Sequence, residues 1–253
     1  MSNTSLLPSL FLFLAMLVAA EVGVRLGRIR AAKDPEGSYV GVGAIEGAVL
    51  ALLGLILAFT FSGASSRLDT RRQLIVQEAN AIGTAYLRLD LLPPNEQPDV
   101  RQLFRKYLDA RLEVYEELGN PAESDAARAN AESLQRQIWT RAEAGTHGQN
   151  SAIPVLNAVN EMIDVTTARN LALQTHTPRL IVYLMYCLAV LSAMIAGYGM
   201  SPAKQRNWLL TVIFSMAISM TVYVVLDLDN PSSGLIRLSA AEKVLAQLRE
   251  TIK

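Results

Sequence analysis

Four apolar windows constrain this chain more than any other feature. The hydrocarbon core of a bilayer is about 30 Å thick, and a helix needs roughly 20 apolar residues to cross it. The windows are 6–20, 42–62, 180–200 and 208–226. The first is short, but no Lys or Arg precedes it and no small-residue cleavage site precedes Glu21. We therefore interpret it as a retained span rather than a signal peptide, and expect four spans.

The rest of the chain is also predicted to be helical. Apolar residues recur at helical spacing over 100–118, 122–144, 153–173 and the tail 239–252, and no alternating strand pattern is present. The sequence thus predicts an all-α protein: a four-span membrane bundle with a helical extramembrane bundle. Lys and Arg number 23, as do Asp and Glu, so net charge offers no basis for binding nucleic acid. With 51% hydrophobic residues the chain is not disordered.

The second span has no stop signal at its end. No proline follows until Pro93, and the helical pattern continues from about 45 to 92. At about 1.5 Å per residue this helix would be roughly 70 Å long, twice the thickness of a bilayer. The expected division is 1–62 for the first two spans, 63–179 for a helical insertion, 180–226 for the last two spans and 227–253 for the tail.

No motif of an enzyme is present. The sequence lacks HExxH, a Walker loop, GxSxG and CxxC, so we expect no catalytic residues. His147 and His176 lie in polar connecting stretches and are not expected to bind a metal. The single cysteine, Cys187, excludes a disulfide within one chain and is expected to be a small core residue of the third span.

The second span carries a carboxylate and a row of small residues. Glu46 is costly inside a membrane, and it is either an ion-pathway residue or an interfacial acid favoured by the helix dipole. The small residues indicate either close helix packing or the lining of a pore between symmetric copies. Leu55 and Phe59 lie beside them, as core residues or as an apolar constriction. The candidate pore-lining set is Glu46, Gly47, Ala51, Gly54, Leu55, Ala58, Phe59, Ser62 and Ser65.

Four charged residues crowd the exit of the second span: Arg67, Asp69, Arg71 and Arg72. One interpretation is ordinary membrane-flanking charge with pairing along the helix. In a symmetric oligomer the same residues would form charged rings at a pore mouth, and positive rings favour anions.

Two stretches resemble the bestrophin family of ion channels, and more closely its bacterial bestrophin-like relatives. One is LLGLILAFTFSGASSRLDTRRQLIVQEAN, 52–80, which matches the pore helix and its charged turn; the other is DLDNPSSG, 227–234, which matches an acidic step before Asp/Asn-Pro-Phe-Gly. Arg71 and Arg72 replace paired tryptophans of the family, and Ser232 and Ser233 replace its aromatic residue.

The resemblance implies a homopentameric channel with the second span around the pore, and the insertion and both termini in the cytoplasm. The bulky neck residues of the family would fall on Gly54, Ala58 and Ser62, which are small. The resemblance also raises a cation site at Asp227, Asp229 and Asn230, where animal relatives help bind calcium. Calcium prefers six to eight oxygen ligands, so we expect these residues to act as a junction and no cofactor to be required.

Two other functions stay open at the level of sequence. A stator-like proton-channel subunit shares the layout, but would need a single-span partner bearing an Asp. A membrane sensor would place the insertion outside the cell. The arginines and lysines of the short loops nearly balance those on the other side, so charge does not fix the orientation. The expected partners are the lipid bilayer, further copies of the chain and a small ion, in a bacterial inner membrane.

Overall fold

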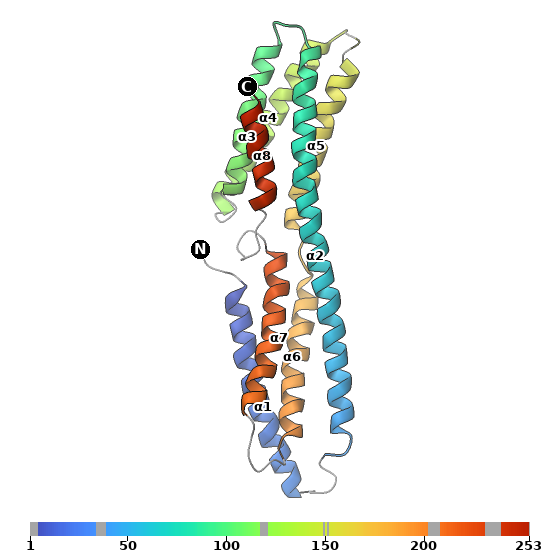
Figure 1. The fold of residues 1–253 in the computed structure, drawn as a ribbon, viewed down its shortest axis with the longest axis vertical. Coiled ribbons are helices and arrows are strands. Elements are labelled where there is room, and N and C mark those ends of the chain that lie inside the picture. The colour runs from blue at the N-terminus through green and yellow to red at the C-terminus, as the bar shows by residue number, and fades with distance from the viewer. Residues whose placement is uncertain are drawn as a thin grey trace. The chain divides into compact units, whose positions relative to one another are not determined.

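The computed structural model describes residues 5–33, 39–116, 121–148, 150, 152–201, 208–230 and 239–252, and these residues form helices and turns with no strand (Figure 1). The helices are α1 (Leu6–Lys33), α2 (Val42–Arg88), the 3-10 helix η1 (Leu89–Leu91), α3 (Gln97–Glu116), α4 (Pro121–Thr146), α5 (Ala152–Gln174), α6 (Arg179–Gly199), α7 (Trp208–Asp229) and α8 (Ser239–Thr251). The all-α prediction is confirmed. Helices long and apolar enough to cross a membrane occur in four places, as expected.

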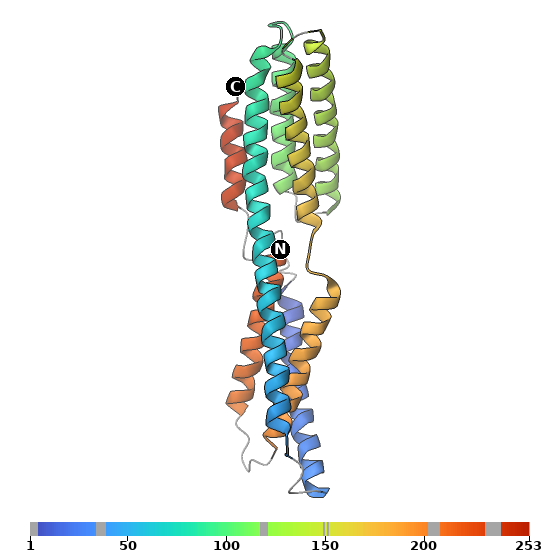
Figure 2. The ribbon, with the colours of Figure 1, turned by 90° about the vertical axis from the view of Figure 1, so that its right-hand side faces the viewer.

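The chain divides into two compact units. One comprises residues 2–66 and 176–236 and is called here the membrane unit; the other comprises 67–175 and 237–253 and is called the extramembrane unit. The long second helix is confirmed: α2 is unbroken over 47 residues (Figure 2) and contributes to both units. It ends through η1 at Leu92, whose extended backbone (ψ 156°) is the conformation that the following Pro93 requires.

The core of the membrane unit forms where α1 packs against α6 and α7. Glycines allow α1 and α6 to touch along their backbones. A Cβ added at Gly23 would lie 2.0 Å from the carbonyl oxygen of Met194, and one at Gly197 would lie 2.1 Å from that of Ala20. Side chains such as Leu12, Met16 and Met185 are fully buried around this contact. Small residues at this contact therefore let the two backbones approach closely, as is common where helices pack in membranes.

Two helices are longer than the apolar windows predicted. α1 continues to Lys33, so most of the loop expected after Ala20 is helical. Glycines along this extension keep α1 in contact with α6: a Cβ at Gly27 would lie 2.9 Å from the carbonyl oxygen of Tyr198 in α6. α7 continues past Leu226 to Asp229, because the two acidic side chains of its last turn have partners inside the protein, described below.

The extramembrane unit is a bundle in which α3 packs on α4 and α8, and α4 packs on α5. Phe104, Tyr107 and Leu108 of α3 are fully buried in it. The tail helix α8 packs on the bundle through the buried Leu245 and through a bidentate ion pair. Arg249 donates from Nε and Nη2 to the two carboxylate oxygens of Asp109, at 2.5 and 3.1 Å.

Some predicted features lie outside the described residues. These are Pro231, Ser232, Ser233 and Gly234 of the stretch that resembles the family, and most of the short loop after Gly199.

Candidate functional site

A stripe of small residues on α2 faces away from the rest of the membrane unit. Gly47, Ala51, Gly54, Ala58 and Ser62 are all exposed, and Ser65 is half-buried. A Cβ added at Gly47 or Gly54 would meet no atom within 4 Å. At about 100° per residue these positions fall within a narrow arc of the helix. We call this set the α2 stripe.

The opposite side of α2 packs on the membrane bundle. Leu53, Thr60 and Ala64 are 2%, 7% and 0% exposed, and Leu53 joins the core formed by α1, α6 and α7. Thr60 turns its hydroxyl inward along the helix and donates to the carbonyl of Ile56 at 2.6 Å. Only 6% of the most apolar window of α2 is buried, against 28–33% for the other three candidate spans. The single chain therefore leaves the stripe side of α2 uncovered.

The other predicted pore-lining residues are placed differently. Leu55 and Phe59 are exposed, 52% and 68%, beside the stripe. Glu46 is half-buried and turned from it: its Oε2 would lie 3.6 Å from a Cβ added at Gly199 of α6. Cys187, expected in the core of α6, is exposed. The structure thus brings the small residues, Leu55 and Phe59 to one side of α2, and leaves Glu46 beside α6.

The four charged residues at the exit of the second span have different roles within the chain. Arg71 is 1% exposed and donates from Nε to the carbonyl of Ala172 at 3.0 Å and from Nη2 to that of Thr175 at 2.7 Å. It thereby meets carbonyls at the end of α5, where the helix dipole favours a cation. Asp69 and Arg72 form an exposed ion pair at 3.5 Å, and Arg67 is half-buried. Arg67, Asp69 and Arg72 remain accessible to solvent.

The acidic pair at the end of α7 is buried. Asp229 accepts a hydrogen bond of 2.7 Å from the backbone N–H of Thr177, just before α6 begins, and Tyr223 donates to Asp227 at 3.3 Å. Asp229 is 5% exposed and Asp227 is 1% exposed. Asn230 donates to the carbonyl of Leu226. The Asp229 contact joins the end of α7 to the segment before α6, and the other two hydrogen bonds lie at the end of α7 itself. In the described part of the chain, no three residues among His, Cys, Asp and Glu lie close enough to hold a metal ion.

The extramembrane unit contains a buried charged cluster that was not predicted from the sequence. Glu78 of α2 lies between Arg111 of α3 and Arg169 of α5, and all three are at most 1% exposed. Arg111 Nε donates to Glu78 Oε1 at 2.7 Å, and Arg169 Nη1 donates to Glu78 Oε2. Each residue lies on the apolar face of its helix, for example Glu78 between Ile75 and Ile82. A charge on an apolar face was the signal that could have revealed the cluster.

Two further hydrogen bonds extend this cluster to α4. The hydroxyl groups of Tyr107 and Thr166 are 3.0 Å apart, and Gln135 Nε2 donates to Tyr107 Oη at 3.0 Å. We call Glu78, Tyr107, Arg111, Gln135, Thr166 and Arg169 the Glu78 network. It ties together all four main helices of the extramembrane unit, so it specifies how they associate.

Burial and charge act in opposite directions on the pKa values of this network. Burial alone raises the pKa of Glu78, but the charges and hydrogen bonds of the two guanidinium groups outweigh it and lower that pKa overall. For Tyr107, burial dominates and raises the pKa to about 12. For Arg169, burial dominates and lowers the pKa to about 10. At neutral pH the carboxylate and both guanidinium groups are therefore charged and Tyr107 is neutral.

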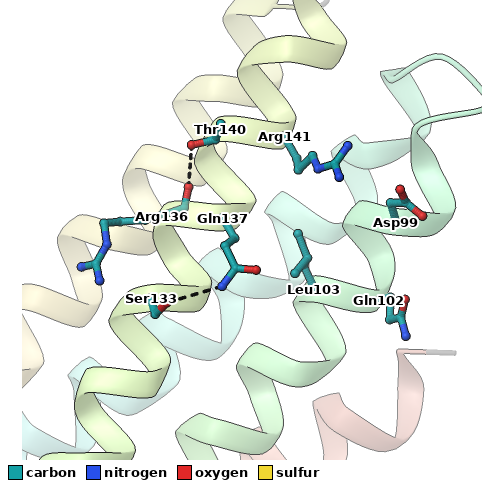
Figure 3. A pocket seen from close by; sticks show the side chains of 8 residues that line it. All are labelled: Asp99, Gln102, Leu103, Ser133, Arg136, Gln137, Thr140 and Arg141. Atoms are coloured by element: carbon teal, nitrogen blue, oxygen red, sulfur yellow. Dashed lines mark hydrogen bonds between the residues drawn. The ribbon is translucent and has the colours of Figure 1, made fainter.

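The extramembrane unit also carries a groove of 520 Å³ between α3 and α4 (Figure 3). Leu103 lies at its centre, and Asp99 and Arg141 stand on opposite walls (Figure 3). Gln137 donates to Ser133 on its own helix, and Thr140 to the carbonyl of Arg136. Most of the lining side chains are exposed. The groove is a polar surface hollow without a buried polar floor, and we assign it no ligand.

Comparison with known proteins agrees with this architecture. Residues 11–242 match the model of the Bestrophin-like domain family. Variants of a bacterial Bestrophin homolog from Klebsiella pneumoniae share the fold. One has a TM-score of 0.67 at 15% identity, over 96% of this chain and 98% of that chain. A second has a TM-score of 0.67 at 13% identity, over 100% and 99%.

A third variant has a TM-score of 0.66 at 14% identity, over 94% of this chain and 99% of that chain. No curated protein gave a significant match to the sequence. The family match covers all four apolar spans apart from the first few residues, and it includes both stretches on which the resemblance was based. The chain is thus an integral membrane protein that belongs to the Bestrophin-like family.

Proposed function

We propose that this protein is a homo-oligomeric ion channel in which the α2 stripe of each copy lines a central pore. The observation that carries the proposal is the uncovered stripe itself: six small residues on one side of a membrane-spanning helix whose other side is packed. Small side chains leave room and expose backbone dipoles to an ion. Symmetric copies related by rotation would bring the stripes together around one axis.

Five copies are the proposed number, as the family resemblance implies, with the extramembrane unit and both termini in the cytoplasm of a bacterial inner membrane. Leu55 and Phe59 border the stripe and would supply the narrowest apolar point of the pore. Such a constriction gates by excluding water.

Anions are the proposed permeating ions. Arg67 and Arg72 are at least partly exposed where α2 leaves the membrane unit, against one exposed acid, Asp69. Each copy would therefore add an excess of positive charge to a ring at the pore mouth, which attracts anions. Arg71 supports the end of α5 and is not part of this ring.

Ion flux from liposomes tests the proposal. Purified protein is reconstituted with a chloride gradient, and flux is compared for the wild type, Ala58→Trp on the stripe and Met216→Trp on α7. Met216 is also exposed, 59%, so it serves as a matched control for a bulky substitution on a spanning helix. We expect chloride flux that Ala58→Trp reduces at least tenfold and that Met216→Trp leaves within a factor of two.

Four results would overturn the proposal or part of it. Absence of flux at several pH values and calcium concentrations would argue against a channel. An equal loss of chloride flux in both tryptophan variants would show that the stripe does not line the ion pathway. A reversal potential that follows the cation gradient would contradict anion selectivity, and particle images with a number of copies other than five would contradict the pentamer.

A further inference from the structure

The membrane unit contains an apolar groove that the proposed pore does not use. Its volume is 200 Å³, its lining surface is wholly apolar, and it lies among α1, α2 and α6. The principal lining residues are Gly23 and Leu26 of α1, Val42 and Ile45 of α2, and Met194 and Tyr198 of α6. Ile45 lies about 160° around α2 from Gly47, so the groove and the α2 stripe are on different sides of the helix.

The shape of the groove follows from the glycine contact described above. At Gly23 the backbones of α1 and α6 touch, so the floor is formed by two helices without an intervening side chain. Leu26 and Ile45 at its edge are 48% and 58% exposed, which leaves the groove open to whatever surrounds the membrane unit. In a bilayer that surrounding is lipid, and an open, wholly apolar groove fits part of an acyl chain.

A row of charges continues the groove at the end of α1. Gly23, Leu26, Arg30 and Lys33 are spaced i, i+3, i+7 and i+10, so they lie along one face of the helix. The two cations are exposed, and both lie in the last turn of α1. Lys33 is about 10 Å further along the helix axis than Leu26. The same helix face thus offers an apolar seat followed by two positive charges.

The other two arginines of this segment lie elsewhere on the helix. Arg25 is about 100° and Arg28 about 160° around the helix from Leu26. Arg25 forms an exposed ion pair of 3.0 Å with Glu21. They provide a control in which the same charge is removed from different faces of the same helix.

We propose that the groove binds one acyl chain of an anionic phospholipid and that Arg30 and Lys33 bind its phosphate. A basic pair beside a membrane-embedded apolar groove favours a lipid with net negative charge. A zwitterionic lipid would bind less tightly, because its positively charged headgroup would be held near the same two cations and repelled by them. The proposal does not depend on whether the protein conducts ions.

Lipid binding to the full-length protein tests this assignment. The protein, in neutral detergent, is mixed with phosphatidylglycerol or with phosphatidylcholine of the same chains, and bound lipids are counted by native mass spectrometry. We expect phosphatidylglycerol to bind at least tenfold more tightly and to raise the thermal midpoint more. The double variant Arg30→Gln with Lys33→Gln should lose this preference, whereas Arg25→Gln with Arg28→Gln should keep it.

A second variant tests the acyl chain. Ile45→Trp fills the groove and should weaken phosphatidylglycerol binding at least fivefold, with Met216→Trp as the control for bulk. Equal affinity for the two lipids, or equal losses in the two double variants, would overturn the proposal. Unchanged lipid binding in Ile45→Trp would also overturn it, because the lipid would then be held only by charge attraction at the surface. A change in subunit number in Ile45→Trp without a change in bound lipid would make the groove a contact between copies.

Discussion

The two parts of α2 differ in what they leave uncovered. In the extramembrane unit, Ile75, Glu78, Ala79 and Ile82 are all at most 3% exposed, so the helix finds partners for its inward face within the chain. In the membrane unit, one side of the same helix packs, whereas a Cβ added at Gly47 or Gly54 of the α2 stripe would meet no atom within 4 Å. A helix that is satisfied in one unit and uncovered in the other indicates that the missing partner is outside the chain. In the proposed channel, that partner is further copies of the protein.

The largest expected effect is the loss of stability when the buried carboxylate of Glu78 is removed from the extramembrane part of α2. Glu78→Ala leaves Arg111 and Arg169 buried without their carboxylate, and removing one member of a buried ion pair costs about 3–5 kcal/mol. Denaturant titration of the purified protein measures the loss. Glu161→Ala on α5 removes an exposed carboxylate and should change stability by less than about 0.5 kcal/mol. Similar losses in the two variants would contradict the role of the Glu78 network.

Two glycine substitutions separate packed from uncovered small residues. Gly197→Ala places a Cβ 2.1 Å from the carbonyl oxygen of Ala20 and should destabilise the membrane unit by about 3 kcal/mol. Gly54→Ala meets no atom of its own chain and should be neutral or stabilising by up to about 1 kcal/mol, from helix propensity. Thermal midpoints and subunit number measure both. A large loss of folded protein in Gly54→Ala would show that the stripe is a tight contact rather than an open surface.

The pH dependence of stability follows from the lowered pKa of Glu78. Below its usual pKa, near 4.3, the unfolded carboxyl takes up a proton while the folded one stays charged. The contribution of Glu78 is therefore full above about pH 5 and is lost as the pH falls through the folded pKa. The stability difference between wild type and Glu78→Gln should be constant from about pH 5 to 8 and shrink below about pH 4. A difference that grows in acid would contradict this assignment.

The smallest expected effect is at the exit of the membrane unit. Asp69 and Arg72 form an exposed pair, and such pairs contribute about 0.5 kcal/mol or less. Asp69→Asn should therefore leave the thermal midpoint nearly unchanged. In flux experiments the same variant should increase the preference for anions, because it removes the exposed acid beside Arg67 and Arg72. A lower anion preference in this variant would contradict the assignment of these charged residues to the ion pathway.

Hydrophobic periodicity predicted most of the fold because each helix carries its own pattern. The four spans, the continuation of α2 beyond the membrane window and the helices of the insertion were all visible in local spacing. The ends of α1 and α7 were not, since Gly27 and Asp229 depend on contacts with residues far away in the sequence. The helical spacing of the small residues showed that they share one side of the second span, and their role as a pore lining stays a prediction. The positions of Arg71 and Glu46 depend on packing that local spacing does not reveal.

By itself, the sequence determined the class of the molecule: an all-α membrane protein with four spans, a long second helix and the stretches that resemble a bestrophin. Length and apolar content suffice for this, because a bilayer imposes its thickness on any helix that crosses it. Only the tertiary structure decided which small residues are buried and which charges are paired. Gly197 and Gly54 look alike in sequence, and so do Arg71 and Arg72. Their roles differ because distant helices pack against one member of each pair and leave the other exposed.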